Sequence, residues 1–470
     1  MKGSIGLYLT CLILVSITFT GCNTVSHTLN NPSITPAPPA DSTSNNVETI
    51  RETPRDNVIN IFSQTDELPR LIERYQELHP DFPYKIQMFN FSTADMDFHA
   101  VLDQYLAGGE DIPDIYCVES YHVPKYSRGD SSKYATPYKE LGIDLDNLIN
   151  EADIAQYVID MGTNQEGEIV SLAYMGSGGA FIYRRSIAMS VWGTDEPDII
   201  KDKIGPGWDK FFEAAAELKA KGYGIVSGVG DIWHSIENSA QKPWVVDGKL
   251  YIDPKREAFL DYAKELIDKG YSNNTYNWRD EWFYDMKGSG EKEILGFFGP
   301  SWLVNYILEP YSGGEVIGEG TYGDWAICQP PVGFFWGGSW VFVHRDSHYK
   351  EYIGNLIKWI TLDSSDTGLQ YIWANGTFDN KNKVKEAVAS GAVMKKVSNK
   401  LDFVGYQDVF DVFDKAARLA NGKNLSEYDE IINDYWRKQV AEYTAGNKTK
   451  EQAIEDFRQM VNDKLDIAVE

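Results

Sequence analysis

Cysteine and histidine are scarce in this chain, with 4 and 7 residues among 470. Cys11 and Cys22 fall near the start, whereas Cys117 and Cys328 stand far apart inside apolar runs. This spacing matches no zinc-binding pattern and no disulfide framework. We predict no bound metal and no cofactor. Cys117 and Cys328 are interpreted as small buried side chains, and a bridge between them is the open alternative.

Positive charge is also in deficit, because 44 Lys and Arg face 70 Asp and Glu, for a formal net charge of −26. An acidic surface repels phosphates, so nucleic acid is not expected as a partner. Aromatic residues make up 13% of the chain and hydrophobic residues 43%. That content excludes disorder of the main body and is sufficient for two or three domains. Aromatic side chains together with acidic charge are compatible with carbohydrate recognition.

Long apolar runs are missing except near the N-terminus. Residues 5–17 are apolar but too short for a membrane span, which is typical of a signal peptide. The next residues, Phe19-Thr20-Gly21-Cys22, resemble a bacterial lipobox. We predict a signal peptide over 1–21 and lipidation of Cys22; a signal peptide with a chance cysteine is the alternative. Residues 22–55 are rich in Asn, Pro, Ser and Thr and predict a flexible tether from the lipid anchor.

The body begins with alternating strand and helix patterns. Strands are predicted at 58–62, 84–89 and 114–118, with a helix in each gap. This alternation favours an α/β fold with a parallel sheet. Ligands of such sheets bind beyond the carboxyl ends of the strands. The pattern therefore points to Gln64 and Asp66 after the first strand, and to Glu119 and Tyr121 after the third.

Two later stretches have the pattern strand, glycine-rich loop, strand, over 169–183 and 325–343. We interpret both as crossings between two lobes. In the second, two prolines end a strand, and a loop predicted to carry Trp336, Gly338, Ser339 and Trp340 lines the cleft. Glycine lets a backbone approach a ligand closely, and an indole offers a flat face to a sugar ring. The alternative is a surface turn with tryptophans in the core.

Further tryptophans are candidate plates for the apolar faces of a sugar. We include Trp233, Trp278, Trp282, Trp302 and Trp373, whereas Trp192, Trp208, Trp359 and Trp436 are expected in the core. Sugar hydroxyls also need carboxylates, amides or bridging waters. Asp66, Glu119 and Asp231 are candidate acceptors, although each carboxylate is also a candidate helix cap or solvated charge.

Several short segments, in order, resemble one family. They are the lipobox at Cys22, the run Gly108-Gly109-Glu110-Asp111-Ile112-Pro113-Asp114, Trp208-Asp209, Phe298-Gly299-Pro300-Ser301-Trp302, Pro330-Pro331 with Gly337-Gly338-Ser339, and 445–453. On these segments the chain is similar to the extracellular solute-binding lipoproteins of bacterial ABC sugar importers, the maltose-binding-protein-like family 1. Residues 271–290 and about 400–445 are longer than in a minimal member, so the shape of the cleft is left open.

The resemblance implies a two-lobed periplasmic-binding-protein fold of type II, closing on a sugar by a hinge. We place the first lobe at 56–172 plus 336–398 and the second at 173–335 plus 399–470. It also implies that Trp302 stacks on the sugar, that Glu119 to Tyr121 give polar contacts, and that 336–340 give aromatic and amide contacts. The expected function is delivery of an oligosaccharide to an ABC permease, without catalysis, by a monomer lipid-anchored on the outer face of a Gram-positive cell membrane.

Two other classes of protein remain open. A surface glycoside hydrolase would use a pair of carboxylates, and 70 acidic residues make some pair inevitable. No hydrolase motif is recognisable, and no Gly-x-Ser-x-Gly elbow occurs. A lipoprotein that senses or adheres to carbohydrate would share the fold. Incubation with oligosaccharides separates the enzyme from the binding protein, because only the enzyme yields products.

Overall fold

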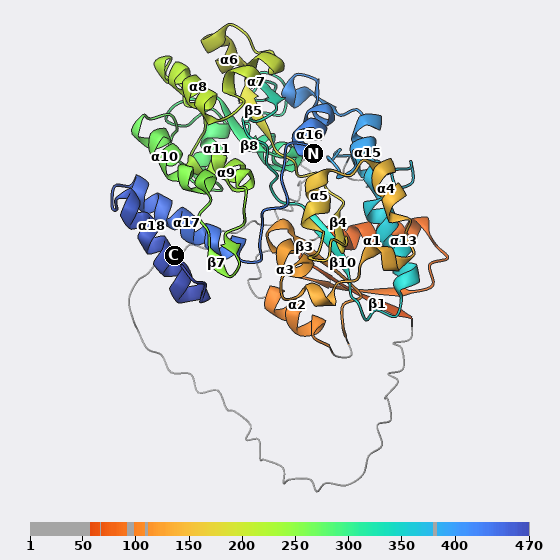
Figure 1. Cartoon of the computed structure of the whole chain (residues 1–470). Helices are drawn as coiled ribbons and strands as arrows, with labels where there is room; N and C mark the ends of the chain where they lie inside the picture. Colours follow the sequence, from red (N-terminus) through yellow and green to blue (C-terminus); the bar gives the residue numbers. More distant parts are fainter. Residues whose placement is uncertain (1–56, 66, 92–97, 109–110, 379–382, 470) are drawn as a thin grey trace, which may run out of the picture.

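The computed structural model describes residues 57–65, 67–91, 98–108, 111–378 and 383–469. The predicted signal peptide, Cys22, the tether and Asp66 lie outside these residues. Within them, no helix is both long and apolar enough to cross a membrane. Two sheets, each in its own lobe, account for the main architecture (Figure 1).

The first lobe is built on a five-stranded sheet of order β2-β1-β3-β10-β4. β1 pairs in parallel with β2 and β3, whereas β10 is antiparallel to β3 and β4. The parallel part confirms the sequence prediction, and β10 is added by the chain when it returns from the second lobe. The strands are β1 (Val58–Ser63), β2 (Lys85–Asn90), β3 (Ile115–Glu119), β4 (Ser171–Ala173) and β10 (Ser339–Val343).

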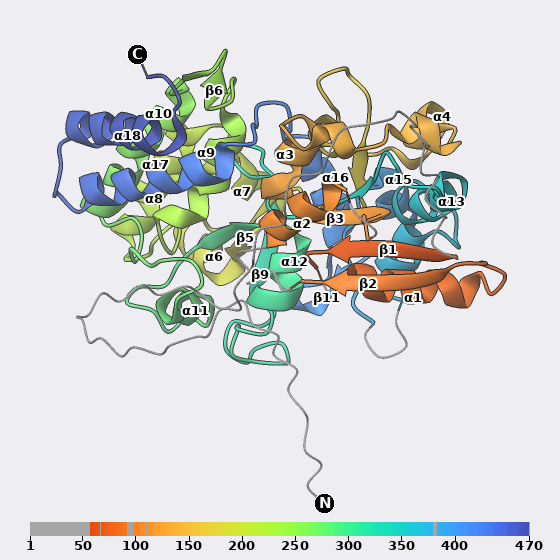
Figure 2. The same cartoon turned by 90° about the horizontal axis from the view of Figure 1, so that it is seen from below.

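Helices cover both faces of this sheet (Figure 2). The first of them, α1, buries Leu68, Leu71, Ile72 and Tyr75, the spacing of one helical face. The helices of this lobe are α1 (Glu67–Leu78), α2 (Phe98–Leu106), η1 (Ser120–His122), α3 (Val123–Ser127), η2 (Ser132–Tyr134), η3 (Tyr138–Leu141), α4 (Leu145–Ala152), α5 (Gln156–Met161), α13 (Lys350–Thr361) and α14 (Leu369–Ala374).

The second lobe has a three-stranded antiparallel sheet of order β8-β5-β9. Its strands are β5 (Ala180–Arg184), β8 (Gly296–Gly299) and β9 (Trp325–Cys328), with short pairs β6 (Val245–Val246) and β7 (Lys249–Leu250), and β11 (Lys400–Leu401) and β12 (Gln407–Asp408). Its first helices are α6 (Arg185–Trp192), α7 (Pro197–Ile204), α8 (Trp208–Ala220), η4 (Val229–Ile232), α9 (Trp233–Ser239), α10 (Pro254–Asp268) and α11 (Asp280–Met286).

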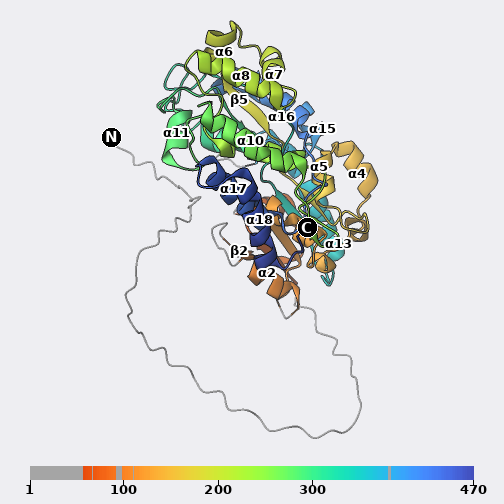
Figure 3. The ribbon, with the colours of Figure 1, turned by 60° about the vertical axis from the view of Figure 1, so that its left-hand side comes forward.

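The remaining helices follow β8. They are α12 (Ser301–Leu303), which continues into the π-helical turn η5 (Val304–Leu308), then α15 (Gly391–Lys396), η6 (Asp402–Val404), α16 (Val409–Ala417), α17 (Asp429–Thr444) and α18 (Lys450–Leu465). α18 begins with the predicted capping box, because the Gln452 backbone N–H donates to Thr449 Oγ1 and the Thr449 N–H donates to Gln452 Oε1. α17 packs on α10 and α18 (Figure 3). It also contacts η1 of the first lobe.

Both predicted crossings are confirmed. The chain leaves the first sheet after β4 and enters the second at β5, and it returns between β9 and β10. The crossings lie side by side, because the Trp336 N–H donates to Ser177 O at 3.0 Å and the Gly179 N–H to Phe334 O at 2.8 Å. The lobe boundaries themselves stay predictions. Val393 and Met394 of α15, which the sequence assigns to the first lobe, pack with α16 in the core of the second.

Cys117 in β3 and Cys328 in β9 are buried and free. They belong to the separate cores of the two lobes. Their interpretation as small buried side chains is confirmed, and the alternative of a bridge between them is wrong.

Candidate functional site

A cavity of about 880 Å³ lies between the lobes. On the side of the first lobe, its wall includes residues that follow β1 and β3, namely Thr65, Glu119 and Tyr121. The returning crossing contributes Trp336 to Ser339, and the second lobe supplies most of the other lining residues. The carboxyl ends of the parallel strands therefore face the cavity, as the strand pattern predicts.

Three indoles form a contiguous group at the cavity. Trp302, in the short helix α12, donates from Nε1 to the backbone carbonyl of Trp336 at 3.1 Å. The rings of Trp302 and Trp336 meet edge to face with centroids 4.9 Å apart. The ring of Trp278 lies parallel to that of Trp302, at 6.2 Å and 8°. A rigid apolar surface of this kind suits the C–H faces of a sugar.

His234 packs against Trp336 of this indole group. The imidazole stacks on the Trp336 indole, with centroids 4.5 Å apart and planes at 25°. His234 belongs to α9, and the same helix holds the crossing, because Ser235 Oγ donates to Val332 O and the Phe335 N–H donates to Asn238 Oδ1. The position of the Trp336 ring is thus fixed by both its backbone and its neighbour.

Carboxylates give the first-lobe wall its charge. Glu67 and Glu119 both line the cavity, and the Tyr174 hydroxyl donates to Glu67 Oε2 at 3.1 Å. Burial raises the pKa of Glu119 to about 7, and the charges of Glu67 and Glu430 add to the effect. A carboxyl group with this pKa is both acceptor and donor near neutral pH, which suits hydroxyl groups.

The structure brings most of the predicted site residues together at the cavity. They are Glu119, Tyr121, Trp233, Trp302, Trp336, Gly338 and Ser339. Gln64 does not line it. Its side chain is buried, and its Oε1 accepts a hydrogen bond from the Glu119 N–H at 3.2 Å, so it holds the loop that carries Glu119.

Three predicted indoles are core residues instead. Trp340 stands inside β10, not in the loop, and its Nε1 donates to Val158 O at 3.1 Å in the first core. Trp373 packs in the same core, 5.5 Å from the Tyr174 ring. Trp282 is fully buried behind Trp278 and donates to Asp231 Oδ1 at 3.0 Å. The indole N–H groups of Trp340 and Trp282 donate to protein acceptors, and all three rings are buried in the cores, so placement of these three at the cavity is wrong.

Several cavity residues come from the two segments that are longer than in a minimal family member. Residues 274–278 line one wall, and Trp278 adopts a left-handed backbone with φ of 70°. From α17 the cavity receives Glu430, Asn433, Asp434, Arg437 and Lys438. The extra length was a signal that these segments shape the cleft, and Trp278 was among the candidate indoles, but nothing in the sequence singles out His234.

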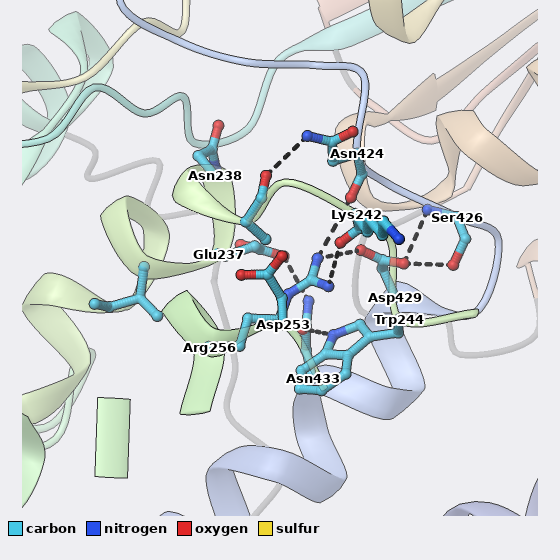
Figure 4. Close-up of polar contacts among 12 residues, drawn as sticks. Glu237, Asn238, Lys242, Trp244, Asp253, Arg256, Asn424, Ser426, Asp429 and Asn433 are labelled. Carbon is cyan, nitrogen blue, oxygen red and sulfur yellow. Dashed lines mark hydrogen bonds and ion pairs between the residues drawn. The ribbon is translucent and has the colours of Figure 1, made fainter. Parts of the chain in front are cut away.

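A buried ion pair fixes α17 against α10 (Figure 4). The Arg256 guanidinium is fully buried, lies over the Trp244 ring at 4.5 Å and meets Asp429 Oδ2 at 3.3 Å. Burial raises the pKa of Asp429 to about 6, although Arg256 opposes the shift. Breaking such a buried pair leaves an uncompensated charge, so α17 is held firmly at the cavity wall.

Metal ligation has no support in the described part of the chain, where no three His, Cys, Asp or Glu side chains are placed to hold an ion. The expectation of no cofactor stays a prediction. The fold and the cavity define a two-lobed α/β binding protein.

The chain belongs to the family of bacterial extracellular solute-binding proteins, whose pattern matches residues 62–367. Among curated proteins, none matches the sequence. Among solved structures, an extracellular solute-binding protein of family 1 is similar at a TM-score of 0.69 and 18% identity, covering 86% of this chain and 99% of that one.

Two sugar-binding proteins have the same fold. The galacto-N-biose-/lacto-N-biose I-binding protein of Bifidobacterium longum, in complex with lacto-N-biose, has a TM-score of 0.62 at 16% identity, over 88% of this chain and 98% of its own. The sugar-binding protein MalE of Xanthomonas citri has a TM-score of 0.64 at 13% identity, over 86% and 96%. At these identities the likeness establishes the fold.

Proposed function

We propose that the protein binds an oligosaccharide in the cavity between its lobes and delivers it unchanged to the permease of an ABC transporter. The observation that carries the proposal is the indole group of Trp278, Trp302 and Trp336, which shares the cavity with Glu119 and Tyr121. Aromatic plates and hydroxyl-directed polar groups are the two elements that a sugar needs. The sugar complexes among proteins of the same fold support the proposal.

The size of the cavity favours more than one sugar ring. A volume of about 880 Å³ is at the upper end of ordinary small-molecule sites. Several aromatic plates also suit several successive rings. A ligand that contacts both lobes stabilises the closed arrangement, because only that arrangement offers all the contacts.

The proposed cellular setting is the outer face of the cell membrane. A lipid on Cys22 would hold the mature chain there, and residues 22–55 would let the globular part reach a permease. We propose a monomer on a Gram-positive surface. Mass spectrometry of the protein extracted from its native membrane checks the anchor, because the mature N-terminal peptide should begin at a diacylated Cys22.

The test of ligand class is a thermal-shift screen of oligosaccharides followed by product analysis. A binding protein gains stability in proportion to ligand occupancy, and chromatography should recover the sugar intact. Release of shorter sugars would refute the proposal and indicate a glycoside hydrolase instead. A binding response with no loss of sugar uptake after deletion of the gene would favour a sensing or adhesion role.

A further inference from the structure

A directed chain of hydrogen bonds runs from the second core to the cavity wall. Trp244 Nε1 donates to Asn433 Oδ1 at 2.7 Å, and Asn433 Nδ2 donates to Glu237 Oε1. Glu237 Oε2 lies 3.2 Å from His234 Nδ1, and the same nitrogen lies 3.4 Å from the hydroxyl of Tyr121. The first four side chains are buried, and Figure 4 shows the link from Trp244 through Asn433 to Glu237.

The direction of each hydrogen bond in this chain is set by the hydrogen bond before it. An indole N–H can only donate, so the Asn433 amide must turn its oxygen to Trp244 and its NH2 group to Glu237. With Glu237 as a carboxylate, which can only accept, the contact assigns the proton of His234 to Nδ1. That N–H is then shared between Glu237 and the oxygen of Tyr121. The tautomer of His234 is thus set by Trp244, which lies outside the cavity wall.

The direction of these hydrogen bonds determines whether the Tyr121 hydroxyl can donate to a ligand. Burial above all raises the pKa of its phenol well above 10, so the hydroxyl keeps its proton. Because its oxygen accepts from His234, that proton is not used within the chain. Tyr121 lines the cavity, so the proton is available to a bound molecule.

We propose that the chain from Trp244 to His234 fixes Tyr121 as a hydrogen-bond donor to an oxygen of the bound sugar, which makes Glu237 a positioning residue for specificity. The inference rests on the proposed function, because it takes a sugar as the occupant of the cavity. Glu237 itself does not line the large cavity between the lobes; it borders a smaller cavity of about 20 Å³ behind Trp336, large enough for about one water molecule.

The isosteric variant Glu237→Gln separates this role from simple packing. Its amide oxygen must still accept from Asn433, so its NH2 group faces His234 Nδ1. The imidazole proton then moves to Nε2, and the Tyr121 hydroxyl turns to donate to Nδ1. We expect E237Q to weaken sugar binding about as much as Tyr121→Phe does, about 2- to 12-fold, the range of one neutral hydrogen bond.

The affinity test uses calorimetry with maltose, lacto-N-biose and β-1,6-galactobiose. The control is Glu213→Gln, the same chemical change on the exposed face of α8, which should leave the affinity unchanged. The double variant Y121F/E237Q should bind no more weakly than either single variant, because both remove the same donor. Additive losses, or wild-type affinity in E237Q beside a loss in Y121F, would overturn the proposal.

A second measurement needs no ligand. In protein with ¹⁵N-labelled histidine, the ring nitrogens of His234 report which of them carries the proton. The proposal requires a protonated Nδ1 in the wild type and a bare Nδ1 in E237Q. A bare Nδ1 in the wild type would refute the chain of donors. If the chain is confirmed but no sugar of the panel binds, the proposed function fails for those sugars while the hydrogen-bond direction holds.

Discussion

Replacing Glu386 with glutamine is expected to stabilise the protein above pH 7. The Glu386 side chain is fully buried, and it accepts hydrogen bonds from Asn305 Nδ2 at 2.8 Å and from Ser301 Oγ at 3.4 Å. Those partners belong to α12 and η5, the segment that carries Trp302. Burial raises the pKa of Glu386 from the ordinary 4.5 to about 7, and the hydrogen bonds offset only part of that shift.

The sign of the effect follows from proton binding. Between about pH 4.5 and 7 the folded protein holds a proton on Glu386 that the unfolded chain has released, so stability falls as the pH rises. A rise of the Glu386 pKa from 4.5 to about 7 lowers the free energy of unfolding at high pH by about 3 kcal/mol at most. Since glutamine keeps the shape and most hydrogen bonds, we expect a gain of about 1–3 kcal/mol at pH 8 and little difference at pH 4.

Urea unfolding at pH 4, 6 and 8, followed by circular dichroism, measures this gain. The exposed substitution Glu151→Gln is the control and should change the free energy of unfolding by less than about 0.5 kcal/mol. The reasoning is refuted if E386Q is less stable than the wild type at pH 8. It is equally refuted if the difference between the two proteins is the same at all three values of pH.

Three further predictions concern the indoles and the thiols. Trp302→Ala and Trp336→Ala should each weaken sugar binding by about 1–3 kcal/mol; calorimetry that finds unaltered affinity in both would remove them from the site. Trp340→Ala should lower the free energy of unfolding by about 3–5 kcal/mol, and a loss below about 1 kcal/mol in urea would contradict its place in the core. Cys117 and Cys328 are buried and their pKa values are raised, chiefly by burial, so peptide mapping should find both unmodified by a thiol reagent until urea unfolds the chain.

The fold was largely predictable because its signals are local. The spacing of Leu68, Leu71, Ile72 and Tyr75 is sufficient to predict α1, and the glycine and proline residues near 174–179 and 330–338 mark the two crossings. The capping box of α18 also lies within four consecutive residues, Thr449 to Gln452. Where the physical cause acts over a few residues, the sequence contains it.

The site was only partly predictable, because its composition depends on contacts between distant segments. Trp336 and Trp340 are four residues apart, yet one faces the cavity and the other the first core, since β10 begins at Ser339. Trp278 reaches the cavity through a left-handed backbone in a loop. α17 forms a wall through contacts with distant segments, among them the pair of Asp429 with an arginine 173 positions away. No local pattern carries this information.

The central claim is that the cavity between the lobes holds an unmodified oligosaccharide. The crystal structure of the protein with the sugar that raises its melting temperature most tests this directly. We expect continuous density for an intact sugar against Trp302 and Trp336, with a hydroxyl or ring oxygen within hydrogen-bond distance of Tyr121 Oη. A sugar bound elsewhere on the surface, or a cleaved product in the cavity, would contradict the account.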